Sequence, residues 1–266
     1  MKASPAAARR PPIAAAIVLG AAWAVLAHAP ASWVASAVTA ASGQRVQLCD
    51  ARGDWNDGEA RVVLSSGPQG RDATLLPGML HWSVGLRQIW RGALQLQLRW
   101  PPLAQGPLVW RAQARVHGWR LEQTLPARWQ ASFPATLLEG LGTPWNTLAL
   151  RGLVRVELRH VELSSSAGRL NTRGGLSIDA SGMSSRLSAL SPLGSYRVDL
   201  VGNGASAGLS LRTVSGALVL AGDGVWNGQR LQFSGTARAA PGEQQSLATL
   251  LGLLGRREGD HVRIAL

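Results

Sequence analysis

The stretch LQLQLRWPPLAQGPLVWRAQARV, from Leu94 to Val116, shows the fold of this chain most clearly. Leu94, Leu96 and Leu98 alternate with polar residues, and from Leu108 onward every second residue is again apolar. A period of two places one face of a β-strand on a core and the other face in water. The stretch therefore predicts two half-buried strands, which a Pro- and Gly-containing segment separates.

The same alternation recurs through the rest of the chain, at Val154 to Leu158, Leu176 to Ile178, Val198 to Leu200 and Leu209 to Leu211. Turn residues such as Gly174-Gly175 and Gly202-Asn203-Gly204 separate these runs at roughly the 8–12-residue spacing of an all-β meander. We therefore expect a mainly β protein, in which residues 43–266 form an extended antiparallel sheet or a β-sandwich-like domain.

The composition is that of a globular chain, with 266 residues of which 46% are hydrophobic. Lys and Arg outnumber Asp and Glu by 27 to 15, which gives a formal net charge of +12. A basic protein attracts anionic partners, although a GC-rich genome that favours Arg codons explains the same excess. The arginines alternate with apolar residues along strands, which argues against nucleic-acid binding. Cys49 is the sole cysteine, so no intrachain disulfide forms.

The N-terminal segment reads as a membrane anchor. Three basic residues within the first ten precede an uninterrupted apolar run, IAAAIVLGAAWAVLA, from Ile13 to Ala27. Residues 11–30 are just long enough for a tilted membrane helix of about 20 residues. The alternative is a cleaved signal peptide, but cleavage after Ala29 would leave Pro30 directly behind the cut. The positive-inside rule then places residues 1–10 in the cytoplasm and the bulk of the chain in the periplasm of a bacterium.

Two helices are expected beyond the anchor. In residues 31–42 apolar side chains recur at helical spacing before Gly43, which predicts a short linking helix. In QSLATLLGLL, from Gln245 to Leu254, the leucines 247, 250, 251 and 254 share one face, and Gly255 takes the C-terminal capping position. A charged turn at residues 256–260 and a last strand, HVRIAL, follow.

Tryptophan is unusually frequent, with 11 copies. One row recurs every eight to ten residues, namely Trp82, Trp90, Trp100, Trp110, Trp119 and Trp129. Such a row is either a stacking platform for sugars or bases or a ladder that packs on the core, each ring burying on the order of 200 Å². We favour packing, because Trp100 and Trp110 fall on the apolar phase of their own strands.

A small phrase occurs near both ends of the chain, as GDWNDGEARV from Gly53 to Val62 and as GDGVWNGQRLQFSG from Gly222 to Gly235. Asn227-Gly228 favours a tight hairpin turn, because both residues tolerate a positive φ. Trp226 would then close the end of the core beside the turn. We interpret both phrases as hairpins between paired strands.

Catalytic and metal motifs are weak. Gly204 to Gly208 matches the G-x-S-x-G elbow around Ser206, but it stands between two strands rather than before a helix, which predicts a hairpin loop. The five histidines stand far apart, and the acidic cluster Asp50, Asp54, Asp57 and Glu59 is too irregular for a calcium loop and reads as a solvated turn. We expect no enzyme activity, no catalytic, cofactor-binding or metal residues, and no cofactor.

Two regions resemble the type II secretion system protein N (GspN) family. GQRVQLCDARGDWNDGEARVVL, from Gly43 to Leu64, is similar to the family's opening, although Asp54 replaces a small or apolar turn residue. From Leu190 to Gly255 the chain resembles the family in its order of a Pro-Leu-Gly-x-Tyr turn, a Gly-rich hairpin, two strands and a Leu-rich helix. The resemblance implies a single-pass inner-membrane component of the general secretion pathway, with an AsmA-like fold and no catalytic residues.

The resemblance implies a function through protein contacts, with other secretion-system subunits of the inner-membrane platform and the secretin as partners. The alternative that the alternating strands leave open is an AsmA-like periplasmic lipid-handling or envelope-biogenesis protein, because the apolar face of such a sheet can meet either protein or lipid.

Overall fold

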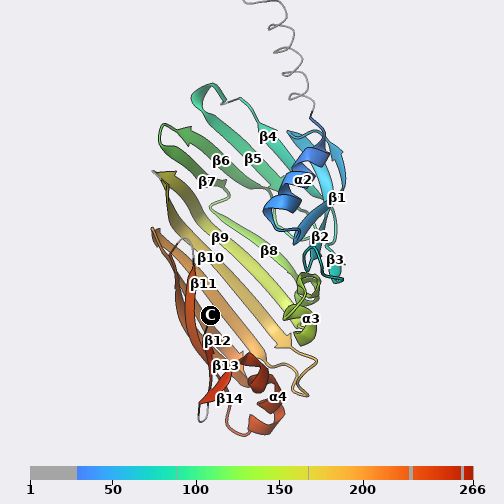
Figure 1. Cartoon of the computed structure of the whole chain (residues 1–266), viewed down its shortest axis with the longest axis vertical. Helices are drawn as coiled ribbons and strands as arrows, with labels where there is room; N and C mark the ends of the chain where they lie inside the picture. Colours follow the sequence, from blue (N-terminus) through green and yellow to red (C-terminus); the bar gives the residue numbers. More distant parts are fainter. Residues whose placement is uncertain (1–28, 88, 167, 228–229, 259–260, 266) are drawn as a thin grey trace, which may run out of the picture.

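The computed structural model describes residues 29–87, 89–166, 168–227, 230–258 and 261–265. Within these residues 16 strands form one antiparallel sheet (Figure 1). The prediction of a mainly β fold is confirmed, and of its two forms the extended sheet is the one observed. The strands are β1 (Val46–Gly53), β2 (Asp57–Ser65), β3 (Ala73–Leu75), β4 (Leu80–Gly85), β5 (Ala93–Arg99), β6 (Leu108–Arg115), β7 (Gly118–Leu125), β8 (Arg128–Pro134), β9 (Arg151–Ser166), β10 (Arg169–Ser184), β11 (Gly194–Gly204), β12 (Ala207–Gly216), β13 (Leu218–Trp226), β14 (Leu231–Ala239), β15 (Arg256–Glu258) and β16 (His261–Ala265).

The sheet is a meander, because most neighbours in sequence are also neighbours in space. Its order is β1-β2-β4-β5-β6-β7-β9-β10-β11-β12-β13-β14-β16-β15, with β3 beside β2 and β8 beside β9. The long strand β9 pairs with β7 along Glu162–Ser166 and with β8 along Leu153–Arg159. The long strand β9 thus joins the part of the sheet formed by β1 to β7 to the part formed by β10 to β16.

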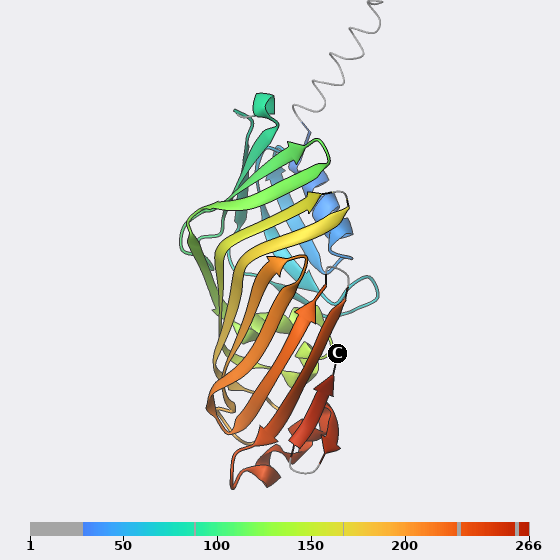
Figure 2. The ribbon, with the colours of Figure 1, turned by 90° about the vertical axis from the view of Figure 1, so that its left-hand side faces the viewer.

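The middle of the sheet bends at a bulge between β9 and β10 (Figure 2). His160 has a φ of 46° and Gly174, opposite it, a φ of 91°, while the register shifts between Arg173 and Gly175. A side chain at Gly174 would collide with the backbone carbonyl of His160, so glycine is required there. Gly174-Gly175 therefore lies inside a strand, and its interpretation as a turn between strands was wrong; bulges of this kind bend a strand and increase its twist.

The two faces of the sheet differ in chemistry. Register rows place aliphatic side chains of β9 to β12 on one face and Arg, Asp, Glu and Ser on the other. The helices lie on the apolar face, around which the sheet curves (Figure 1). We call it the concave face and the polar one the convex face.

Helix α2 (Ala31–Ala41) confirms the helix expected after the anchor. It does more than connect, since Ala31 packs with Ala60 of β2 and Trp82 of β4 in a buried cluster. The small side chains of Ala31 and Ala35 are both buried, which is how a helix approaches a sheet closely.

The opposite end of the concave face is covered by short helices. The 3-10 helix η2 (Ala135–Leu141) and helix α3 (Trp145–Leu148) lie beside β9, where Ala135 packs with Val154 and Met183. Helix α4 (Gln244–Leu254) buries Leu247 and Leu250 against Leu218, as its leucine pattern predicted. The other 3-10 helix of the described residues, η1 (Ile89–Arg91), stands between β4 and β5.

Both expected hairpins are confirmed. The Asn227 N–H donates to the Arg230 carbonyl across the turn between β13 and β14, and the Asp54 N–H donates to the Asp57 carbonyl between β1 and β2. Trp226 is half-buried at the end of β13, beside the turn, whereas the tryptophan of the first phrase lies within its turn.

Two further expectations need correction, and one falls outside the described residues. Arg256 to Glu258, expected in a charged turn, forms the edge strand β15. Trp82 and Trp100 pack on the core as predicted, but Trp90 is 94% exposed and Trp119 43%. No helix among the described residues is long and apolar enough to cross a membrane. The expected cytoplasmic residues 1–10 and residues 11–28 of the expected anchor lie outside the described residues.

Candidate functional site

The concave face carries two rows of aliphatic side chains in its centre. The hydrogen-bond register places each row across β9, β10, β11 and β12. We call them the apolar rows; they are Leu158, Leu176, Leu200 and Leu209 in the first row, and Val156, Ile178, Val198 and Leu211 in the second. All eight side chains are half-buried, so part of each remains in contact with solvent.

The helices leave most of these rows uncovered. Helix α2 makes its main contacts with β1 and β2, η2 with β2, β3 and β9, and α4 with β14, β15 and β16. Full burial of an aliphatic side chain contributes about 1.5–3 kcal/mol, so the half-buried rows leave part of that free energy unused. Val156 and Ile178 also pack on the cluster of Ala135, whereas the remaining row residues form a partly exposed apolar surface, which is a candidate site for a partner or ligand.

The rows end at a strip of glycines on β13 and β14. Gly224 stands opposite Leu209 and Gly222 opposite Leu211, while Gly222 also pairs with Gly235. A side chain built on Gly222 or Gly235 would collide with the ring of Phe233, so that ring lies directly over the glycines. The apolar surface therefore continues from leucines onto an aromatic ring without a polar break.

The convex face is built from charge pairs around Asp199. Its carboxylate accepts a hydrogen bond from Ser177 Oγ at 2.6 Å and lies 3.7 Å from the guanidinium groups of both Arg159 and Arg212. Arg159 Nη2 also donates to Ser177 Oγ at 2.7 Å. Because these groups span four strands, the network fixes register while the apolar rows lie on the other side.

Two residues away along the same strands, Arg197 of β11 and Asp179 of β10 form a direct pair. The hydrogen bond to Asp179 raises the pKa of the Arg197 guanidinium, which stays protonated. On the concave face the neighbouring Tyr196 donates its hydroxyl to the Leu218 carbonyl at 3.2 Å, and burial raises its pKa to about 12.

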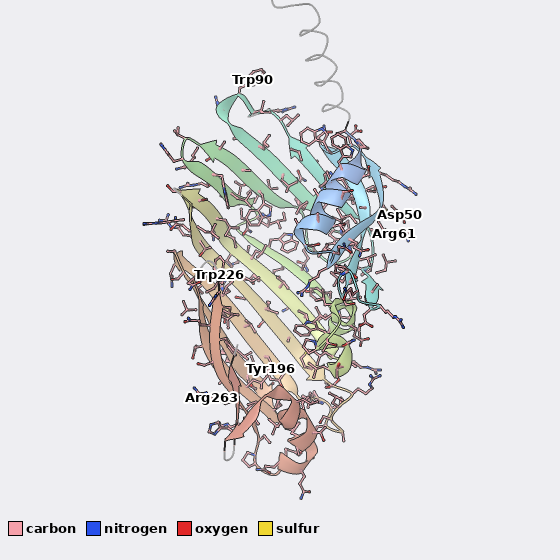
Figure 3. All side chains as sticks on the ribbon, in the orientation of Figure 1. Asp50, Arg61, Trp90, Tyr196, Trp226 and Arg263 are labelled. Atoms are coloured by element: carbon pink, nitrogen blue, oxygen red, sulfur yellow. The ribbon has the colours of Figure 1, made fainter. Side chains whose placement is uncertain are left out.

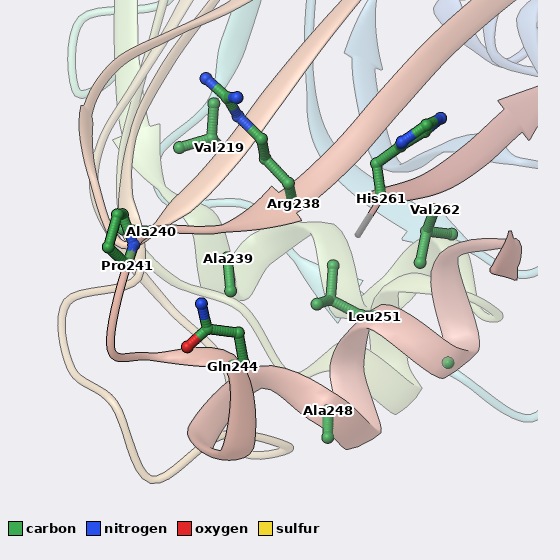
Figure 4. A pocket seen from close by; sticks show the side chains of 11 residues that line it. Val219, Arg238, Ala239, Ala240, Pro241, Gln244, Ala248, Leu251, His261 and Val262 are labelled. Carbon is green, nitrogen blue, oxygen red and sulfur yellow. The ribbon is translucent and has the colours of Figure 1, made fainter. Parts of the chain in front are cut away.

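A cleft of about 540 Å³ lies where α4 meets β14 and β16 (Figure 4). Ala239, Gln244 and Leu251 line its helix side, whereas the side chains of Val219 and Arg238 point away from the helix. Its lining is mixed, and no group of titratable side chains converges in it. The cleft extends the covered end of the concave face and adds no reactive group.

The motifs weighed in the sequence do not come together in one place. Ser206 lies in the hairpin turn between β11 and β12, where its carbonyl accepts from the Asn203 N–H. His81 Nδ1 lies 3.2 Å from Glu59 Oε2, a contact across β2 and β4 that sequence spacing did not reveal. Asp50 stands beside Arg61 at 3.8 Å on an exposed surface. Within the described residues no three His, Cys, Asp or Glu side chains gather as a metal site.

The apolar rows were the feature that sequence reasoning left undecided. Alternation predicted which residues share the face, and only the topology tells that the described residues form no second sheet to cover it. The fold thus defines a class of protein, a single-sheet module with a partly exposed apolar face.

The particular family follows from the sequence as a whole. Residues 44–265 match the family model of type II secretion system (T2SS), protein N, and the chain belongs to this family. It is therefore a component of the membrane-associated type II secretion machine, and the family is not one of known enzymes. No curated protein and no solved structure matches the chain.

Proposed function

We propose that this protein is an accessory inner-membrane component of the type II secretion system that acts through protein–protein contacts. In this role it assists the export of folded periplasmic proteins across the outer membrane. The observation that carries the proposal is the pair of uncovered apolar rows, because an exposed apolar face on a family of secretion components fits a docking surface. Other subunits, in the inner-membrane platform or the secretin, would supply the covering surface.

The proposed topology is a cytoplasmic segment at residues 1–10, an anchor at residues 11–30, a linking helix at residues 31–42 and a periplasmic domain at residues 43–266. The basic start and the apolar run from Ile13 to Ala27 support it. The first described residue, Ala29, is also bonded to the turn between β1 and β2, since its carbonyl accepts from the Trp55 N–H at 2.9 Å. An anchor at this point would attach the sheet to the membrane at the end where α2 packs.

Two neighbouring residues of β11 provide the test. Leu200 lies in the first apolar row, whereas Val201, next to it, lies on the same side of the strand as Asp199. We expect Leu200→Glu to leave secreted enzymes folded but trapped in the periplasm, because a charge on the docking face opposes apolar contact. Val201→Glu is the matched control and should secrete normally. Equal secretion by both variants, at equal protein levels, would contradict the proposal.

The second candidate is lipid handling, which the same rows favour because acyl chains also bind an apolar concave face. It predicts that the chain, purified in a mild detergent, carries phospholipid that native mass spectrometry detects. Leu200→Glu should then lose the bound lipid, whereas Val201→Glu should keep it. A chain that carries no lipid in either form would exclude this candidate and leave the docking role.

A further inference from the structure

The connection between β4 and β5 exposes apolar and basic side chains together. Its described residues Leu86, Arg87, Ile89, Trp90 and Arg91 are all exposed, and we call them the β4–β5 tip. The Trp90 side chain is 94% exposed and that of Ile89 45%. Among the described residues no ion pair involves Arg87 or Arg91. A large aromatic ring held out in water costs free energy unless something covers it.

Backbone hydrogen bonds hold the described residues of the tip. The Ile89 N–H donates to the Leu86 carbonyl at 3.0 Å, and the Gly92 N–H donates to the Ile89 carbonyl at 2.9 Å. Gly92 has a φ of 64°, a conformation that glycine adopts without strain. The Gly92 carbonyl in turn accepts from the Ala114 N–H of β6. Ile89, Trp90 and Arg91 are therefore presented by backbone that is hydrogen-bonded to the sheet.

The tip lies at the end of the molecule where the chain enters the fold. A short series of hydrogen bonds connects the two places, from Ala29 to Trp55 and from Asn56 to Val84, two residues before Leu86. Trp90 stands at the upper extreme of the molecule, whereas Tyr196 lies near the opposite end (Figure 3). The 28 residues that precede Ala29 contain the apolar run from Ile13 to Ala27.

We propose that the β4–β5 tip is a membrane-contact site that inserts Ile89 and Trp90 into the interfacial layer of the bilayer. Trp is the residue enriched at membrane–water interfaces, where its ring meets acyl chains and its N–H meets polar headgroups. Arg87 and Arg91 flank the apolar pair and would bind anionic phosphate groups. The occupant is a lipid surface, because the apolar run before Ala29 leads the chain to one at this same end. The proposal rests on the proposed anchor.

The insertion would give the sheet a second point of attachment. One anchored segment alone allows the domain to rotate about it, whereas two contacts at one end fix which way the concave face points. The tip thus sets the orientation in which the apolar rows meet a partner.

The test uses the full chain in vesicles of phosphatidylcholine and phosphatidylglycerol, mixed three to one. A nitroxide is attached to Ile89→Cys in a Cys49→Ser background, because Cys49 is exposed. Val201→Cys is the matched control; the Val201 side chain is also 45% exposed, and six strand spacings of about 4.8 Å separate β11 from β4. The measurement is how readily dissolved oxygen and a water-soluble nickel chelate reach each label. We expect the ratio of oxygen access to chelate access to be several-fold higher at position 89 than at position 201.

Two further variants separate lipid contact from other causes. Trp90→Ala should move the label at 89 toward the aqueous value, whereas Trp145→Ala on α3 should not. The double variant Arg87→Gln, Arg91→Gln should weaken the protection of the label at 89 from the nickel chelate in these mixed vesicles. In vesicles of phosphatidylcholine alone it should have no effect. Equal chelate access at 89 and 201 would overturn the tip contact, as would protection at 89 from both oxygen and chelate, which marks a protein contact. Release of the chain by alkaline carbonate would overturn the anchor and this proposal with it.

Discussion

The indole N–H of Trp82 donates to the backbone carbonyl of Trp55 at 3.1 Å, and this bond joins β4 to the turn between β1 and β2. The Trp82 ring is buried beneath α2, beside Ala31 and Ala60. One side chain therefore connects the first hairpin, the third strand of the sheet and the helix that follows the proposed anchor. The site where the chain enters the fold is held by tertiary contacts and not by helix propensity alone.

The first prediction concerns the glycine beneath that ring. A Cβ at Gly58 would lie 2.5 Å from Cζ2 of Trp82 and 2.9 Å from the carbonyl oxygens of Arg52 and Asp54. Gly58→Ala should therefore destabilise the fold by about 1–3 kcal/mol through overpacking. Thermal unfolding of the detergent-solubilised chain would show it as a loss of several degrees. Gly208→Ala, where nothing lies within 4 Å, is the control, and a loss of equal size there would refute the argument.

The second prediction compares two leucines of α4. Leu247 is 0% exposed in the cluster with Leu218, whereas Leu253 is 60% exposed on the same helix. Leu247→Ala should cost about 2–5 kcal/mol, because it leaves a cavity between α4 and β13. Leu253→Ala should change stability by less than about 0.5 kcal/mol. Denaturant unfolding measures both, and similar midpoints would show that α4 does not contribute to the core.

The third prediction addresses the convex network. Asp199→Asn removes the charge that Arg159 and Arg212 share and weakens the hydrogen bond from Ser177. Hydrogen bonds to charged groups contribute about 1.5–3 kcal/mol, so we expect a loss of about 1–2 kcal/mol because the site is partly solvated. High salt should reduce the difference. Asp223→Asn, for which no described ion pair is found, should unfold like the parent chain, and a matching loss there would contradict the network.

The periodic strands were predictable because each carries its own burial signal. Leu94 to Leu98 and Val198 to Leu200 alternate whether the apolar face meets a helix, a second sheet or water. For the same reason the alternation left a sandwich open beside a single sheet. Only the pairing of β7, β8 and β9 decides that the meander continues as one layer.

The errors have local physical causes. Arg256 to Glu258 forms the edge strand β15, which pairs with β16. Its residues show no apolar alternation, so the sequence pattern could not predict a strand there. Gly174-Gly175 has the composition of a turn, yet the close approach of the His160 carbonyl requires glycine inside a strand. Trp90 and Trp119 share the spacing of Trp82 and Trp100, which pack on the core. Eight to ten residues is the length of a strand with its turn, so the period does not tell which tryptophan is exposed.

The last prediction is a pH dependence that depends on Tyr196. Burial raises the pKa of its hydroxyl from 10.0 to about 12, and the hydroxyl donates to the Leu218 carbonyl at 3.2 Å. The neutral phenol is the form that the fold accommodates, so its contribution to stability is complete below pH 10. Between about pH 10 and 12 the unfolded chain releases this proton and the folded chain keeps it, which lowers the free energy of unfolding. In Tyr196→Phe the fall attributable to this group should disappear, although the variant should be less stable at pH 8 because the Leu218 carbonyl loses its donor. Urea unfolding of both chains at pH 8 and pH 11 measures the difference, and parallel losses in the two chains would show that Tyr196 is not its source.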